Sequence, residues 1–81
     1  MDKILSKHAK EQMRIRGISE DIVWKIISDN KIFTTENGVT IYHGFIQNQK
    51  KLYLIRIFVN ESVNPNLVIT VYRTSKINKY K

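Results

Sequence analysis

The sequence predicts an α+β domain in which an N-terminal helical hairpin packs on one face of a four-stranded antiparallel sheet. Its apolar residues recur with a helical period up to residue 29 and with a period of two afterwards. Asn37-Gly38 is a strong hairpin turn signal. Leu67–Thr74 is β-branched and aromatic almost throughout, which is typical of a strand. A chain of 81 residues suits one modest core, so we expect residues 1–81 to form a single domain.

The first predicted helix spans Lys7–Arg16. Ser6 precedes it and is a good N-cap, because a serine hydroxyl can accept a hydrogen bond from the first helical turn. Gly17 follows it and suits the left-handed position just past a helix end. The buried stripe of this segment is expected to be Leu5, Ala9 and Met13, which follow one another at a spacing of four.

A second helix is predicted to start directly afterwards and to end at Asp29-Asn30. Ser19 is its N-cap, and Glu20 and Asp21 place negative charge in the first turn, where the helix dipole favours it. Its apolar stripe consists of Ile22, Val23, Ile26 and Ile27.

Four strands follow, and turn residues separate them. Asn37-Gly38 joins the first two, Asn48–Lys50 joins the next two, and a loop with the only proline precedes the last. The predicted strands are Lys31–Thr35, Val39–Gln47, Lys51–Asn60 and Leu67–Thr74.

Strand alternation sorts the side chains of the last two strands between a face that meets the helices and an open face. Arg56, Thr70 and Tyr72 are expected on the open face, unless a bulge shifts the register by one residue. Four apolar side chains would share that face and form a patch large enough to need a protein partner or a homodimer: Leu52, Leu54, Phe58 and Val68.

The net charge of +7 is concentrated at the two ends of the chain. Residues 1–16 hold five Lys or Arg against two acids, residues 73–81 hold four against none, and the remainder is balanced. If the two ends meet in space, they form one positive surface for a phosphate backbone; a merely solvated basic tail is the alternative. The predicted RNA-binding residues are Lys7, Arg14, Arg16, Arg73, Lys76 and Lys79.

Several function classes lack support in the sequence. The chain contains no cysteine and shows no signal peptide, which fits a cytoplasmic protein. No apolar run approaches the length of a membrane span, so no membrane association is expected. The two histidines lack a metal-ligand spacing, and no glycine-rich phosphate loop is present, so we expect neither a metal nor another cofactor.

The remaining polar inventory of His, Tyr, Arg and Lys suits RNA cleavage by side chains alone. In that chemistry Arg56 would hold the phosphate and Tyr72 would act as acid or orienting group. His8 would act as base, because the dipole in the first turn of a helix keeps an imidazole neutral. His8 could instead simply border the core. His43 is expected to pack, since it shares a strand face with apolar residues.

The run from His8 to Ser19, together with Tyr42-His43-Gly44 and the terminal strand, resembles a small family known as a domain of unknown function. That family is grouped with the RelE/ParE-type toxins of toxin–antitoxin pairs and is similar to BrnT-type toxins. The resemblance implies a RelE-like fold, mRNA interferase activity and a tight-binding antitoxin. His8 and Arg16 match the opening motif and Tyr72 the terminal strand. Family members often carry arginine where this chain has Gln12.

Three hypotheses for the function follow. The chain is a toxin ribonuclease acting on mRNA, free or on the ribosome. Alternatively, it is a ParE-like toxin that binds a protein target and cleaves nothing. In the third hypothesis it is a non-catalytic module that binds RNA or a protein partner. A pair of Arg56 and Tyr72 on an open face favours the first of these.

Overall fold

The protein is described by a computed structural model that covers residues 3–29 and 33–77. Two helices accompany one five-stranded mixed sheet whose strand order is β1-β5-β4-β3-β2. In chain order the elements are β1 (Lys3–Leu5), α1 (Lys7–Arg16), α2 (Glu20–Asp29), β2 (Phe33–Glu36), β3 (Val39–Asn48), β4 (Lys51–Asn60) and β5 (Asn66–Thr74). The protein is therefore an α+β domain, as the sequence predicts.

The sheet contains one strand more than predicted, because β1 pairs in parallel with Asn66–Val68 at the start of β5. The other neighbouring strands pair antiparallel, so the sheet is mixed. Three residues are too few to display a period of two, which is why the sequence pattern does not reveal β1. Leu5 belongs to this strand and not to the first helix, but it still packs against the core.

Both ends of α1 follow the capping chemistry expected from the sequence. Ser6 Oγ accepts a hydrogen bond from the backbone N–H of Ala9 at 2.9 Å. Gly17 closes the helix with a φ of 66°, and its N–H donates to the carbonyl of Arg14. The bounds Lys7–Arg16 are thus confirmed. In α2, Ser19 Oγ accepts from the N–H of Ile22, and the last described residue is Asp29.

The hairpin turns explain the register of the antiparallel strands. Asn37 and Gly38 both have positive φ, as do Gln49 and Lys50, so two-residue turns join β2 to β3 and β3 to β4. The predicted bounds of β4 are confirmed and those of β3 differ by one residue. The expected start of the first antiparallel strand, Lys31, lies outside the described residues.

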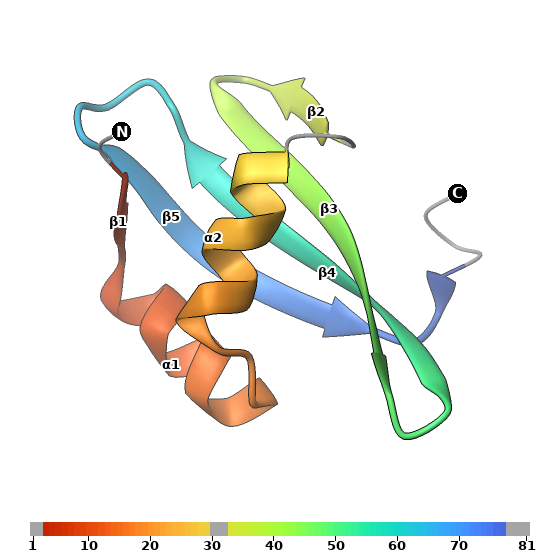
Figure 1. Ribbon diagram of the computed structural model, residues 1–81. Helices are drawn as coiled ribbons and strands as arrows, with labels where there is room; N and C mark the ends of the chain where they lie inside the picture. Colours follow the sequence, from red (N-terminus) through yellow and green to blue (C-terminus); the bar gives the residue numbers. More distant parts are fainter. Residues whose placement is uncertain (1–2, 30–32, 78–81) are drawn as a thin grey trace.

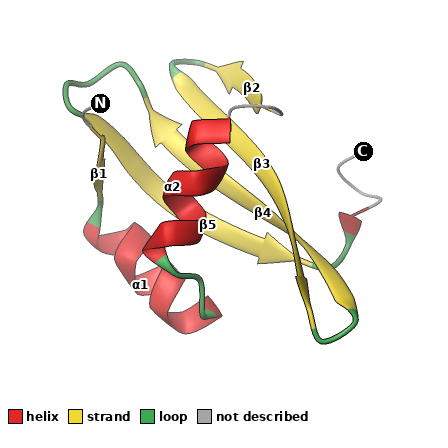
Figure 2. Cartoon of the chain, viewed as in Figure 1, coloured by secondary structure: helices red, strands yellow, loops and turns green. Residues whose placement is uncertain are grey.

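Both helices lie on one face of the sheet (Figures 1 and 2). Ala9 and Met13 of α1 and Val23 and Ile27 of α2 form one core with apolar residues of the sheet: Tyr42, Ile55, Ile57, Val59, Val68 and Val71. We call the other side of the sheet the open face. Within residues 3–29 and 33–77, neither helix has the length and apolar character that crossing a membrane requires.

A β-bulge in β5 overturns part of the predicted distribution of side chains. Phe58 pairs with Thr70 but Val59 pairs with Val68, so Ile69 is the extra residue between them. Val68 therefore joins the core and is fully buried, and its predicted place on the open face is wrong. Leu54 is also only 2% exposed, between Phe45 and Thr74 on the neighbouring strands. The expected four-residue apolar patch does not form.

The bulge is tied to the start of α1. Ser6 Oγ donates to the carbonyl of Ile69 at 2.8 Å, and the Ser6 N–H donates to the carbonyl of Val68 at 3.0 Å. Because β1 pairs only with the first residues of β5, α1 runs beside the second half of that strand. One side of α1 consequently faces the core, while the adjacent side reaches the open face.

Glu61, directly after the end of β4, forms a polar cluster with residues of β3. Its carboxylate accepts hydrogen bonds from the Thr40 hydroxyl and from the Tyr42 hydroxyl, the latter at 2.8 Å. The hydrogen bond from Thr40, followed by that from Tyr42 and by the charge of Lys3, holds the pKa of Glu61 below its ordinary value. Burial, together with Glu61, raises the pKa of Tyr42 to about 12.

We expect Tyr42→Phe to lower the free energy of unfolding at neutral pH by about 1 kcal/mol, since Glu61 is exposed enough for water to weaken the bond. A carboxylate with a lowered pKa stabilises the fold above its unfolded pKa and loses this contribution as pH falls through the folded pKa. The difference between Tyr42→Phe and the parent protein should therefore shrink in acid. Urea unfolding at neutral and at acidic pH measures this difference. An equal difference at both pH values would contradict a stabilising hydrogen bond from Tyr42 to the Glu61 carboxylate.

Candidate active site

An open groove of about 400 Å³ lies where α1 meets β4 and β5 on the open face. We call it the α1–β5 groove. Three elements that are far apart in the sequence contribute to it. Its lining residues are His8, Gln12 and Arg16 from α1, Arg56 and Phe58 from β4, and Thr70, Val71 and Tyr72 from β5.

Local structure explains why these side chains converge. His8, Gln12 and Arg16 are spaced by four residues, so they follow one another along one side of α1, next to the buried side with Ala9. On the sheet, Arg56 pairs directly with Tyr72 across β4 and β5. Because of the bulge, Thr70 and Tyr72 lie on the open face with Arg56, although Val68 in the same strand faces the core.

A polar row crosses the open face at the groove. His43, Arg56 and Tyr72 are direct cross-strand neighbours on β3, β4 and β5. Arg56 Nε donates a hydrogen bond to His43 Nε2 at 3.2 Å. The guanidinium carbon of Arg56 also lies 5.2 Å from the centre of the Phe58 ring. A base, a cation and a phenol are therefore aligned across three adjacent strands.

Arg16 of α1 lies next to the Tyr72 end of this row. Its guanidinium carbon lies 4.8 Å above the centre of the Tyr72 ring, its Nε donates to Gln12 Oε1 at 3.2 Å, and its Nη1 donates to the carbonyl of Arg73 at 3.5 Å. These three contacts hold the guanidinium beside the tyrosine. Tyr72 thus has an arginine from the helix over its ring and a second arginine as its cross-strand neighbour on β4.

The electrostatics of the row favour a neutral imidazole. Burial lowers the pKa of His43, and the positive charge of Arg56 lowers it further. Since Nε2 accepts the hydrogen bond from Arg56, the ring proton resides on Nδ1. At neutral pH His43 is therefore equipped to take up a proton.

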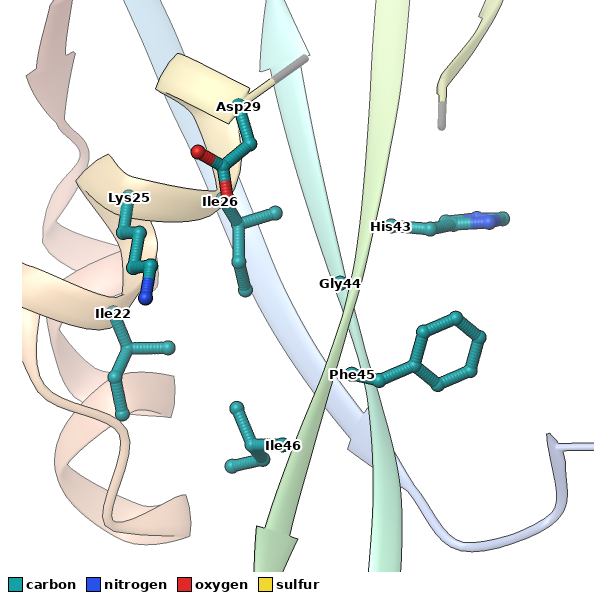
Figure 3. Close-up of a pocket in the computed structure, with 8 residues that line it drawn as sticks. All are labelled: Ile22, Lys25, Ile26, Asp29, His43, Gly44, Phe45 and Ile46. Carbon is teal, nitrogen blue, oxygen red and sulfur yellow. The ribbon is translucent and has the colours of Figure 1, made fainter. Parts of the chain in front are cut away.

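A second cavity, of about 390 Å³, lies between α2 and β3 and has a different character (Figure 3). Its lining residues are Ile22, Lys25, Ile26 and Asp29 from α2 and His43, Gly44, Phe45 and Ile46 from β3. Figure 3 shows the side chains of His43 and Phe45 pointing away from α2, onto the open face. The histidine chemistry therefore belongs to the open face and not to this apolar cavity.

Of the residues predicted from the sequence, the structure brings together His8, Arg16, Arg56 and Tyr72 in the α1–β5 groove. Arg56 and Tyr72 lie on the open face, as the strand alternation predicts. His8 is solvent-exposed in the first turn of α1.

The other predicted RNA-binding residues lie outside the groove. Arg73 pairs with Ile55, which is a core residue, so its side chain lies on the helix face, 4.8 Å above the Tyr53 ring. Arg14 is exposed and forms an ion pair with Glu11. Lys7 and Lys76 are exposed, and Lys79 lies outside the described residues.

Sequence reasoning missed two members of the site, His43 and Gln12. The signal for His43 was the hairpin turn: a two-residue turn at Gln49-Lys50 pairs position 43 with position 56. Gln12 could have been found from its position midway between His8 and Arg16 on one side of a helix. Within the described part of the chain, no group of three or more metal-ligating side chains is present.

Comparison with known proteins places the chain in a family without assigning its chemistry. No curated protein and no solved structure gives a significant match. A family model does match, over residues 5–73, a range that includes every residue lining the α1–β5 groove. The chain therefore belongs to the family described as a domain of unknown function, DUF4258.

Proposed function

We propose that this protein is an endoribonuclease that cleaves mRNA with the side chains of the α1–β5 groove. The observation that carries the proposal is the row of His43, Arg56 and Tyr72, in which an imidazole of lowered pKa accepts a hydrogen bond from a guanidinium. Arg16 adds a second positive charge to the same place. Cleavage of a phosphodiester requires a base, an acid and cations in this kind of proximity.

The reaction begins with attack of the RNA 2′-oxygen on the adjacent phosphorus. His43 Nε2 accepts the 2′-hydroxyl proton once the phosphate has replaced it as partner of the Arg56 N–H. Arg56 and Arg16 stabilise the negative charge that grows on the phosphate oxygens. The bond to the 5′-oxygen breaks, and the leaving oxygen takes a proton from the Tyr72 hydroxyl, which is an O–H donor. The products are a 2′,3′-cyclic phosphate and a 5′-hydroxyl.

This assignment moves the role of base from His8 to His43. His8 lines the groove and remains able to contact the RNA. His43 is the stronger candidate because it is hydrogen-bonded to the proposed phosphate ligand and because burial favours its neutral form. A base fixed beside the cation that holds the phosphate lies close to the 2′-hydroxyl that attacks it.

The cellular setting that we propose is a toxin–antitoxin pair in the cytoplasm. The net charge of +7 supports an RNA substrate. The His8–Ser19 run resembles a family of unknown function that is grouped with RelE/ParE-type toxins, and the RelE-like fold and toxin role that we propose rest on this grouping. The antitoxin would be a protein that covers the groove.

The test is to express the chain in cells and to map mRNA ends by primer extension. We expect growth arrest together with new 5′ ends, and the purified chain should leave a 2′,3′-cyclic phosphate on a labelled RNA. Arg14→Ala serves as a matched control, because it removes an arginine of α1 that lies outside the groove. Growth arrest with intact mRNA would contradict RNA cleavage and point to a ParE-like protein target.

A further inference from the structure

The polar row on the open face is bordered by an exposed aromatic ring. Phe45 follows His43 by two residues on β3, so both side chains project from the same side of the strand, as Figure 3 shows. Phe45 is 46% exposed, whereas the other two aromatic rings of the row and groove, Phe58 and Tyr72, are only partly exposed. An exposed phenylalanine ring next to charged groups suits a ligand with a planar ring that can stack on it.

The charges of the neighbouring row indicate what that ligand is. Phe58 and Tyr72 each lie beneath a guanidinium, that of Arg56 and that of Arg16. Phe45 lies one strand repeat further along β3, roughly 7 Å from His43 along the strand. Because His43 pairs with Arg56, Phe45 is also a diagonal neighbour of Arg56 across β3 and β4, a placement that suits a base next to the phosphate that Arg56 would hold.

We infer that Phe45 is a stacking platform for an unpaired RNA base adjacent to the phosphate that Arg56 holds, so that the substrate class is single-stranded RNA. This inference rests on the proposed function and extends it from cleavage chemistry to substrate recognition. Stacking on an aromatic ring tolerates any base, because every base has a π face. A paired base inside a helix cannot offer that face.

The structure supplies a matched control. Phe33 on β2 is also exposed, at 52%, but it pairs with Tyr42 and lies 6.1 Å from that ring, on the helix face of the sheet. Phe33→Ala thus removes an exposed phenylalanine away from the proposed site. Phe45→Leu removes the ring while it keeps an apolar side chain on the strand, and Phe45→Trp offers a larger stacking surface.

The experiment uses the full chain and a short RNA that carries one 2-aminopurine base and 2′-O-methyl groups that block cleavage. We expect binding to quench the fluorescence of the base. Phe45→Leu should lose the quenching and weaken binding by roughly 5- to 100-fold. Phe33→Ala and Phe45→Trp should behave as the parent protein. An abasic oligomer of the same length should bind equally to all variants.

Two results would overturn the platform. One is that Phe45→Leu quenches the fluorescence and binds the RNA as the parent protein does. The other is that Phe45→Leu loses as much affinity for the abasic oligomer as for the complete RNA, which would mean that Phe45 has a structural role. Cleavage of unmodified RNA separates the two proposals. If Phe45→Leu cleaves RNA as fast as the parent protein, the stacking platform is refuted but the enzyme is not. If the parent protein stacks the base but cleaves no RNA, the enzyme is refuted but the platform is not. Absence of RNA binding refutes both.

Discussion

Replacing Arg56 by alanine should lower the rate of the proposed RNA cleavage by about 100-fold or more, because it removes the cation that we propose stabilises the charged phosphate. Arg56 lies in the middle of the polar row and donates to His43. Its loss should reduce the maximal rate more than the affinity for RNA, since Arg16 remains in the groove. Single-turnover cleavage of a labelled RNA measures both quantities.

Two comparisons make this result interpretable. Arg14→Ala removes one positive charge from an exposed ion pair and should change the rate little. Arg56→Lys keeps the charge but loses the planar donor set, so it should recover only part of the activity. Circular dichroism and thermal unfolding show whether each variant is folded. If Arg56→Ala unfolds, the arginine is structural; if the folded variant is fully active, the phosphate lies elsewhere in the groove.

Replacing His43 by alanine should lower the cleavage rate by roughly 100- to 10,000-fold, the range typical of a lost general base. His8→Ala should cost far less, because His8 lies on the helix side of the groove and is exposed. The two variants thus decide between the two histidines of the chain. A large loss in His8→Ala with full activity in His43→Ala would restore His8 as the base.

The pH dependence provides a second readout for His43. A base must be neutral, so the rate should rise with pH through the pKa of His43 and then level off. Burial and Arg56 both lower this pKa from its ordinary value of 6.5, which places the rise below that value. Arg56→Met removes the positive charge and should move the pKa of His43 upward. Proton NMR titration measures this shift without requiring activity, and His8→Ala assigns the two imidazole signals.

The sequence predicts the local structure well where a single side chain decides it. Ser6 and Gly17 delimit α1, and Asn37-Gly38 joins two strands. Each of these signals acts on its own backbone neighbours, so no knowledge of the tertiary structure is needed. Arg56 and Tyr72 are predictable from strand alternation, which places Arg56 between Leu54 and Phe58 and Tyr72 between Thr70 and Thr74 on one face of the sheet.

Features that depend on distant contacts escaped prediction. The strand β1 forms because Lys3–Leu5 pairs with the start of β5. A segment of three residues is too short for its hydrophobic pattern to predict that pairing. The bulge at Ile69 is stabilised by Ser6, which is 63 residues away in the sequence. His43 looked like a packing residue until the β3–β4 register placed it opposite Arg56. In each case the deciding partner lies on another element.

The bulge at Ile69 has a consequence for how this strand tolerates insertions and deletions. Removing Ile69 itself would restore regular pairing, with Val68 still opposite Val59 and Thr70 still opposite Phe58, so Val68 would stay in the core and Tyr72 on the open face. A turn such as Gln49-Lys50, by contrast, is constrained, because its two residues set which positions of β3 and β4 pair. Across related chains, a one-residue length difference within β5 should therefore fall at position 69, while larger differences accumulate in the exposed loop 62–65, whose residues belong to no strand.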